Sequence, residues 1–199
     1  MVIYALDLFG TAVFAVAGTL AAGRKRMDAF GVIVVAMVTA VGGGTLRDLV
    51  LDADAVFWVR DPNYLYVGVA AALVTFFVAR RFALQGRGLL VADAFGLAVF
   101  TVIGTQKGLA AGAPAAVSVL LGVMTGVAGG IIRDVLCGEA VPLILRKEIY
   151  ATASLAGAVV FAVLWRMQWP QPVRVALAVL VVLGIRLAAL RWGFSLPVM

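Results

Sequence analysis

The sequence of 199 residues contains no histidine, only one cysteine (Cys137), and charged residues at only 13% of positions. Without histidine, the chain lacks the side chain that most often binds metals and carries protons near neutral pH. A single cysteine cannot form an internal disulfide. The sequence also has no serine beside a base, no cluster of metal-ligand residues and no nucleotide-binding glycine loop. We therefore expect a protein that is not an enzyme and holds no cofactor or metal.

Apolar residues, in contrast, make up 64% of the chain, and the mean hydropathy is +1.12. Soluble domains are about 45–50% apolar and about 25% charged. A water-soluble globule of this size cannot bury so large an apolar fraction, because much of a small domain is surface. The composition therefore predicts an all-helical integral membrane protein and argues against a soluble enzyme, a disordered chain or a disulfide scaffold.

The net charge of +6 has two interpretations. In a soluble protein, such a charge would suggest binding to nucleic acid. In a membrane protein, lysine and arginine lie in cytoplasmic loops, where they meet anionic headgroups. We expect the second arrangement, with membrane lipids as partners and no nucleic acid.

Seven apolar segments are long enough to cross a membrane, which requires about 20 residues for a hydrocarbon core of roughly 30 Å. The first of them has no basic residue before its apolar core, so we expect it to be retained rather than cleaved as a signal peptide. The seven predicted spans are Tyr4–Ala22, Ala29–Val50, Tyr64–Ala79, Leu89–Lys107, Ala115–Leu136, Ile149–Arg166 and Val173–Leu190.

The distribution of basic residues predicts an orientation, because seven spans place the two termini on opposite sides. Lysine and arginine concentrate in cytoplasmic loops. We therefore expect a cytoplasmic C-terminus and an N-terminus outside. The basic residues that share a side with the C-terminus are Arg24, Lys25, Arg26, Arg80, Arg81, Arg87, Arg146, Lys147 and Arg191.

A shift of 86 residues aligns the chain with itself, and polar residues coincide as well as apolar ones. Shared Asp, Gly-Gly, Arg-Asp and Tyr in one register predict an internal duplication. The coinciding residues are Asp7 with Asp93, Gly43-Gly44 with Gly129-Gly130, Arg47-Asp48 with Arg133-Asp134, and Tyr64 with Tyr150.

We expect the chain to divide into a first three-helix repeat at 1–81, a second repeat at 87–167, and a seventh helix with a tail at 172–199. Because three is odd, the second copy would enter the membrane from the opposite face. Inverted repeats of this kind are typical of transport proteins, with the pathway at the interface between repeats. A duplication that builds only a plain helical bundle is the alternative.

Glycines interrupt the second and fifth spans at Gly42, Gly43 and Gly44 and at Gly126, Gly129 and Gly130. Each costs a helix about 1 kcal/mol relative to alanine. We expect both helices to kink or unwind there and to face the interior, where freed carbonyl oxygens would suit a cation. Close helix packing on a small-residue face is the alternative.

Two charged pairs follow these glycines, Arg47-Asp48 and Arg133-Asp134. An ionisable group within a span costs about 2.5–3.5 kcal/mol and usually faces the protein interior or water. Because neighbours on a helix point about 100° apart, we expect each arginine to pair with another element. Asp7 and Asp93 are the available acids, although an acid near a helix start also complements the helix dipole. Structural ion pairs and snorkelling are the alternatives for the arginines.

A second polar set precedes the sixth span and consists of Arg146, Lys147, Glu148 and Tyr150. We interpret it either as a contact for a lipid headgroup or a gate, or as a loop with ordinary positive-inside charges. Lys107 lies at a span end, where it is a candidate to line a vestibule, and we group it with this set.

The glycine and Arg-Asp motifs resemble those of the prokaryotic branch of the trimeric intracellular cation (TRIC) channel family, which is also classified as a glycine transporter domain. The resemblance covers nearly the whole chain. The segments that carry it are Gly42-Gly43-Gly44-Thr45-Leu46-Arg47-Asp48, Gly129-Gly130-Ile131-Ile132-Arg133-Asp134, Phe57-Trp58-Val59-Arg60 with Tyr64, and Arg146-Lys147-Glu148-Ile149-Tyr150-Ala151.

The resemblance implies seven helices, a homotrimer in the prokaryotic inner membrane, and an ion pathway within each protomer between kinked second and fifth helices. It implies potassium and sodium as permeant ions and a bound lipid as a candidate ligand. A carrier for a small zwitterion such as glycine, and a scaffold without flux, remain alternatives. The candidate pathway residues are Asp7, Gly42, Gly43, Gly44, Thr45, Arg47, Asp48, Asp93, Gly129, Gly130, Arg133 and Asp134.

Overall fold

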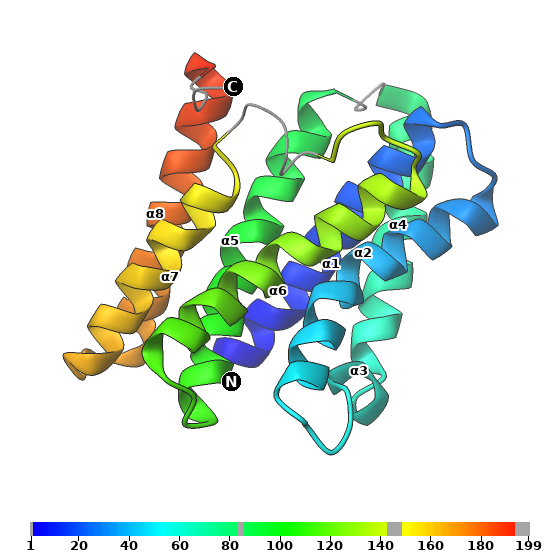
Figure 1. Cartoon of the computed structure of the whole chain (residues 1–199). Helices are drawn as coiled ribbons and strands as arrows, with labels where there is room; N and C mark the ends of the chain where they lie inside the picture. Colours follow the sequence, from blue (N-terminus) through cyan, green and yellow to red (C-terminus); the bar gives the residue numbers. More distant parts are fainter. Residues whose placement is uncertain (1, 83–85, 143–148, 194–199) are drawn as a thin grey trace.

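The computed structural model describes residues 2–82, 86–142 and 149–193, and all regular structure in these ranges is helical (Figure 1). Successive long helices run in opposite directions, so α1, α4, α6 and α8 have their C-terminal ends at the same end of the molecule. The helices are α1 (Val2–Arg24), α2 (Ala29–Val50), α3 (Phe57–Arg60), α4 (Asn63–Phe82), α5 (Arg87–Ala110), α6 (Ala115–Leu136), α7 (Ala151–Arg166) and α8 (Gln171–Trp192).

The predicted spans coincide closely with the long helices, and α2 and α6 have the predicted bounds. Six helices are long and apolar enough to cross a membrane, namely α1, α2, α4, α5, α6 and α8. Helix α7 is apolar but has 16 residues, fewer than a full span requires. The short helix α3, in the loop between α2 and α4, was not predicted. The chain is thus an all-helical integral membrane protein.

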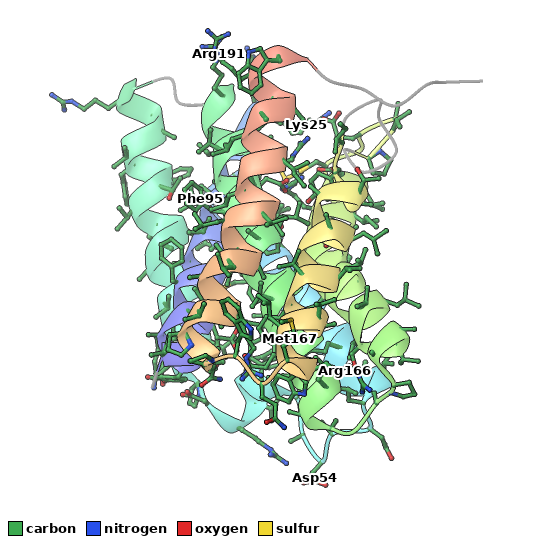
Figure 2. The ribbon with its side chains drawn as sticks, turned by 90° about the vertical axis from the view of Figure 1, so that its left-hand side faces the viewer. Lys25, Asp54, Phe95, Arg166, Met167 and Arg191 are labelled. Atoms are coloured by element: carbon green, nitrogen blue, oxygen red, sulfur yellow. The ribbon has the colours of Figure 1, made fainter. Side chains whose placement is uncertain are left out.

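The two ends of the molecule are told apart by the residues labelled in Figure 2. Lys25 and Arg191 lie at one end, together with the termini of α1, α4, α5 and α8, and we call this the basic end (Figure 2). Asp54 lies at the opposite end, which also carries α3 and which we call the α3 end. At the basic end, Arg24 donates a hydrogen bond to the carbonyl of Gly86, which ties α1 to the start of α5.

Helices α1 and α5 pack against each other at the centre of the molecule. Phe14 and Phe100 stack there with ring centroids 5.1 Å apart. Gly10 and Gly96 leave room for this contact, because a Cβ on Gly10 would touch Phe100 and a Cβ on Gly96 would overlap Phe14. Phe14 and Gly10 lie 86 residues before Phe100 and Gly96, so each repeat offers the other the same surface.

Helices α2 and α6 cross at their glycines in the same reciprocal way. A Cβ on Gly43 would overlap the carbonyl oxygen of Thr125, and a Cβ on Gly129 would overlap the carbonyl oxygen of Thr39. Backbone cannot move aside as a side chain can, so only glycine fits at either position. The close-packing interpretation of these glycines is therefore confirmed.

The expected unwinding at the glycines is wrong. Every residue of α2 from Ala29 to Val50 and of α6 from Ala115 to Leu136 is helical. The backbone groups that a break would free are used within the helices. Contact between the two helices satisfies the glycine pattern without any break, because each glycine lets the other backbone approach.

Cys137, the cap residue that follows α6, is buried with 5% of its surface exposed. Burial raises the pKa of its thiol above the ordinary value of 9.0. Because the thiolate is the reactive form, we expect maleimide to modify the folded protein at pH 7 at least about tenfold more slowly than the protein unfolded in SDS. Mass spectrometry over time measures both rates. Equal rates would contradict this packing of Cys137.

Candidate functional site

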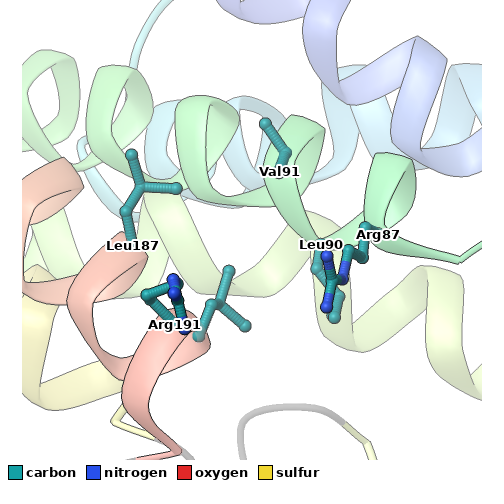
Figure 3. A pocket seen from close by; sticks show the side chains of 6 residues that line it. Arg87, Leu90, Val91, Leu187 and Arg191 are labelled. Carbon is teal, nitrogen blue, oxygen red and sulfur yellow. The ribbon is translucent and has the colours of Figure 1, made fainter.

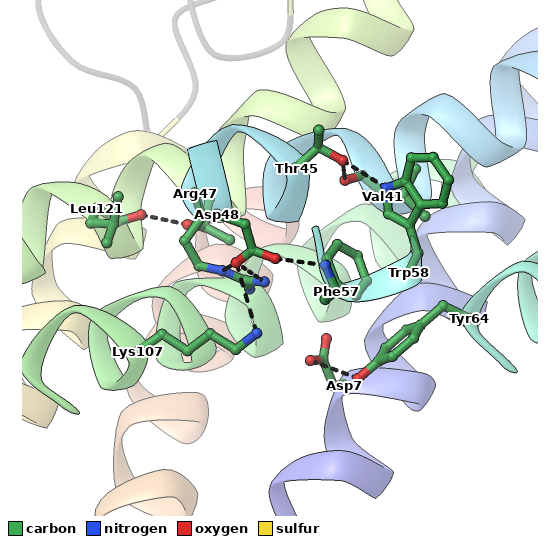
Figure 4. Close-up of polar contacts among 11 residues, drawn as sticks. Asp7, Val41, Thr45, Arg47, Asp48, Phe57, Trp58, Tyr64, Lys107 and Leu121 are labelled. Atoms are coloured by element: carbon green, nitrogen blue, oxygen red, sulfur yellow. Dashed lines mark hydrogen bonds and ion pairs between the residues drawn. The ribbon is translucent and has the colours of Figure 1, made fainter. Parts of the chain in front are cut away.

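Five side chains from four helices converge near the α3 end and form what we call the first cluster (Figure 4). Asp7 comes from α1, Arg47 and Asp48 from α2, Tyr64 from α4, and Lys107 from α5. Asp7, Arg47 and Asp48 are buried. The formal charges of the cluster balance, with two acids and two bases.

Asp48 is the centre of the first cluster. One carboxylate oxygen accepts a hydrogen bond from Arg47 Nε at 2.8 Å and lies 3.9 Å from Lys107 Nζ. The other oxygen accepts from the backbone N–H of Phe57 at 2.9 Å, which fixes the start of α3. The Phe57 ring lies 5.3 Å from the Arg47 guanidinium and 5.7 Å from Lys107 Nζ, so one aromatic ring lies within cation–π distance of both cations.

Two polar groups of the first cluster lack a full set of partners. Tyr64 donates a hydrogen bond to one Asp7 oxygen at 3.1 Å, but the other oxygen, Oδ1, has no partner among the described residues. Arg47 Nη1 is likewise buried without a hydrogen bond from the described part of the chain. Buried polar atoms are normally paired, so each orphan indicates a place for water, an ion or a ligand.

A cavity of about 480 Å³ opens at the α3 end beside the first cluster. Its wall includes Asp48, Tyr64 and Lys107 together with Phe57 and Asp61. The first cluster thus has a route to solvent on this side. Among the described residues, no group of three or more His, Cys, Asp or Glu side chains is placed to hold a metal.

Thr45 is near the first cluster but its hydroxyl is occupied. It donates to the carbonyl of Val41 at 2.8 Å and accepts from the indole N–H of Trp58 at 3.0 Å (Figure 4). These bonds anchor α3 to α2. Gly42 faces Ile132 of α6, and Gly44 faces the Phe57 ring, where an added Cβ would lie 2.5 Å away.

The second cluster lies toward the basic end and is built from the equivalent residues of the second repeat. Arg133 on α6 donates to Asp93 of α5 at 2.6 Å and to its neighbour Asp134 at 2.8 Å. Both Arg133 and Asp93 are fully buried. Tyr150 and Arg186 complete the cluster, with the Arg186 guanidinium 4.9 Å from the centre of the Tyr150 ring.

The two clusters contain equivalent residues in different arrangements. In the second, Arg133 joins both acids, whereas in the first, Arg47 bonds Asp48 and leaves Asp7 to Tyr64. Each cluster also has a base from outside its own repeat, Lys107 in the first and Arg186 in the second. The first cluster borders a cavity, and the second has its central ion pair sealed from solvent.

The pairing predicted for the arginines is confirmed for Arg133, which reaches Asp93 on another helix. It is wrong for Arg47, which bonds Asp48, the next residue on the same helix. The arginine side chain is long enough to bend round to this adjacent carboxylate. Lys107 lies in the first cluster, and Gly130 lies beside the second, with Tyr150. Of the predicted lipid or gating set, Arg146, Lys147 and Glu148 lie outside the described residues.

Arg186 was missed by the sequence reasoning. It lies within the predicted span Val173–Leu190 and is fully buried, where it also donates to the carbonyl of Ile149 at 3.4 Å. The signal was present, because an arginine in an apolar span usually faces the protein interior. Phe57 was noticed only as part of a motif, since nothing local shows that its ring covers two cations.

The fold and the two clusters define an integral membrane protein with two buried polar sites, and proteins of similar sequence and fold are known. A family model described as "Glycine transporter" matches residues 4–80 and again residues 90–166. The inner membrane protein YadS of Escherichia coli K12, a UPF0126 protein, is 49% identical over 99% of this chain and 96% of its own length. A UPF0126 membrane protein of Vibrio cholerae is 47% identical over 98% of this chain and 82% of its own length.

Solved structures agree with these relatives. The TRIC channel orthologue from Rhodobacter sphaeroides superposes with a TM-score of 0.93 at 42% identity, over 97% of this chain and 99% of that one. A prokaryotic TRIC channel solved in 0.5 M KCl gives 0.90 at 27% identity, over 98% and 99% of the two chains. The chain therefore belongs to the prokaryotic TRIC family.

Proposed function

We propose that the protein is a passive channel for monovalent cations, potassium and sodium, with one pore in each protomer of a homotrimer. The observation that carries the proposal is the pair of equivalent acid–arginine clusters, one toward each end of the α2–α6 crossing. Buried ionisable groups in membrane spans mark ion pathways. The similar solved structures, described as TRIC cation channels, support the same function.

The proposed pore lies between two inverted repeats of three spans, with α8 as a seventh span outside the duplication and α7 as the sixth. Reciprocal contacts support this arrangement, since Gly43 meets Thr125 and Gly129 meets Thr39. Contacts in which each partner repeats the other's role are typical of a two-fold axis. The family model, which matches twice with an offset of 86 residues, supports the same division. Bending of α2 and α6 at their glycines is part of the proposal.

Cations enter from the cavity at the α3 end, where Asp7 and Asp48 offset the charges of Arg47 and Lys107. The free Asp7 oxygen is the acceptor available to an incoming cation. The second cluster then forms the barrier of a closed pore, because the sealed Arg133–Asp93 pair blocks the way. Opening requires these two groups to move apart.

In the proposed topology the basic end faces the cytoplasm of a prokaryotic cell and the α3 end faces outward. The positive-inside rule supports this orientation, since Arg24, Lys25 and Arg26 lie at the end of α1, Arg80 and Arg81 at the end of α4, and Arg87 at the start of α5. The Escherichia coli relative is described as an inner membrane protein, which supports the same membrane for this chain.

Recording in planar bilayers tests the proposed function. Purified protein, reconstituted and bathed in unequal concentrations of KCl, is expected to give unitary currents that reverse near the potassium equilibrium potential. Currents that reverse near the chloride potential would contradict a cation channel. A lack of unitary currents from protein that is folded and inserted would contradict a channel of any kind.

A carrier for a small zwitterion is the second candidate. The first cluster favours it in one respect, because a free carboxylate oxygen on Asp7 and a free Nη1 on Arg47 offer partners for an ammonium and a carboxylate. Saturable exchange of labelled glycine into liposomes, without unitary currents, would support the carrier. Ion currents without glycine exchange would support the channel.

A further inference from the structure

A second type of site lies at the basic end, away from both clusters. A cavity of about 460 Å³ opens between the C-terminal ends of α1 and α4. Its lining combines apolar side chains, among them Met27 and Phe76, with two arginines, Arg26 and Arg80, and with Thr19. An apolar cleft bordered by cations at the end of a transmembrane bundle has the chemistry of a phospholipid site.

Thr19 has a buried hydroxyl with no hydrogen-bond partner among the described residues. Four other buried threonines of the bundle donate to the carbonyl four residues earlier, as Thr39 does to Val35 and Thr125 does to Leu121. The repeat equivalent of Thr19 is Thr105, which bonds the carbonyl of Thr101 at 2.8 Å. An orphan hydroxyl in the wall of a cavity indicates an occupant that accepts its proton.

Arg26 is held in an unusual backbone conformation. It follows α1 with φ at 53°, in the left-handed region that favours glycine. Met27 N–H bonds the carbonyl of Ala22 and Arg26 N–H bonds that of Gly23, which completes the turn. The equivalent turn after α5 has the same bonds and places Gly112 at this position with φ at 81°. An arginine here has no conformational advantage, so its charge is the feature that needs an explanation.

Arg80 lies against the wall of the same cavity, with its guanidinium 5.5 Å from the centre of the Phe76 ring. Neither Arg80 nor Arg26 forms a salt bridge with a carboxylate in the described ranges, whereas their neighbour Lys25 pairs with Glu139 at 3.0 Å. Two guanidinium groups without an acid, on the rim of one apolar cleft, offer complementary charge to a phosphate.

We propose that this cavity binds an anionic membrane phospholipid. The phosphate pairs with Arg26 and Arg80, an acyl chain lies along Met27 and Phe76, and the Thr19 hydroxyl donates to an ester carbonyl. This site differs from the set predicted from the sequence before the sixth span. It does not depend on the proposed function, because binding requires no ion flux.

The test compares lipid binding by variants of the whole detergent-solubilised protein. Native mass spectrometry with phosphatidylglycerol measures the fraction of lipid-bound protomers, with phosphatidylcholine as the neutral comparison. We expect the double variant Arg26→Gly and Arg80→Gln to weaken phosphatidylglycerol binding at least about tenfold, and Thr19→Val about threefold. Arg26→Gly should not disturb the fold, because glycine suits the left-handed turn.

A matched control exists between α5 and α8, where Arg87 and Arg191 flank another apolar cavity of about 500 Å³ (Figure 3). Removing these two arginines as Arg87→Gln and Arg191→Gln deletes the same charge at the same end. We expect it to leave binding within about twofold, because the rest of that wall consists of leucine and valine and offers no hydroxyl to an ester carbonyl. If net charge alone attracted the lipid, the two double variants would lose binding equally. Equal losses in the two double variants, or binding retained without Arg26 and Arg80, would overturn the proposal. So would equal binding of water-soluble glycerol phosphate.

Discussion

Replacing Gly43 or Gly129 with alanine is expected to lower the free energy of unfolding by about 2 kcal/mol. The new methyl group would overlap a carbonyl oxygen of the facing helix, at Thr125 for Gly43 and at Thr39 for Gly129. Overpacking in a close-packed interior costs about 1–3 kcal/mol, and here the obstacle is backbone, which moves least. The gain in helix propensity, about 1 kcal/mol, does not offset this loss. Unfolding in increasing SDS, followed by circular dichroism, measures the change.

Gly184 provides the control for these two variants. It lies within α8, and a Cβ placed on it would meet no atom within 4 Å. Gly184→Ala is therefore expected to leave stability unchanged or raise it by up to about 1 kcal/mol. If Gly43→Ala and Gly129→Ala behaved like Gly184→Ala, the helices could not cross as closely as described.

Replacing Asp93 with asparagine is expected to be more damaging, at about 3 kcal/mol. The change removes the negative charge that Arg133 contacts at 2.6 Å, where both groups are fully buried. Breaking a buried pair in this way leaves an uncompensated charge, at a cost of about 3–5 kcal/mol. Asp134 remains bonded to Arg133, which places the expected loss at the lower end of that range. The same SDS titration measures it.

The matched comparison is Asp54→Asn, which breaks the exposed ion pair with Arg60 at 2.8 Å. The Asp54 side chain is 94% exposed, so solvent already screens the interaction. We expect no measurable change in stability. A loss as large in Asp54→Asn as in Asp93→Asn would mean that burial of the Arg133–Asp93 pair does not determine its contribution.

Most of the spans and the burial of both Arg-Asp pairs could be predicted from the sequence because each rests on a local signal. Apolar segments of fixed length gave the helices, and a charge inside such a segment points to the interior, as for Arg47 and Arg133. The alignment of the chain with itself at a shift of 86 residues then identified Asp7 and Asp93 as equivalent acids available to these arginines. In the structure Asp93 bonds Arg133, whereas Asp7 lies in the first cluster and bonds Tyr64.

The role of the glycines could not be settled from the sequence, because consecutive glycines suit both a broken helix and a close crossing. Only the approach of the facing backbone distinguishes the two, and that approach is a tertiary property. The contacts that Lys107 and Phe57 make with Asp48 could not be predicted for the same reason. Lys107 on α5 and Phe57 on α3 both contact Asp48 on α2, and these contacts between helices leave no pattern of residue spacing in the sequence.

The central claim is that the buried clusters line a cation pathway, and the unitary current of Asp7→Asn tests it most directly. Asparagine keeps the shape of Asp7 and an acceptor for the Tyr64 hydroxyl, but it removes the charge beside the free oxygen. Asp54→Asn removes an equal charge from the surface of the same end and serves as the comparison.

We predict that Asp7→Asn lowers the potassium conductance severalfold and weakens the preference for potassium over chloride, while Asp54→Asn conducts like the unchanged protein. Currents from folded Asp7→Asn protein with unaltered size and selectivity would contradict a pathway through the first cluster.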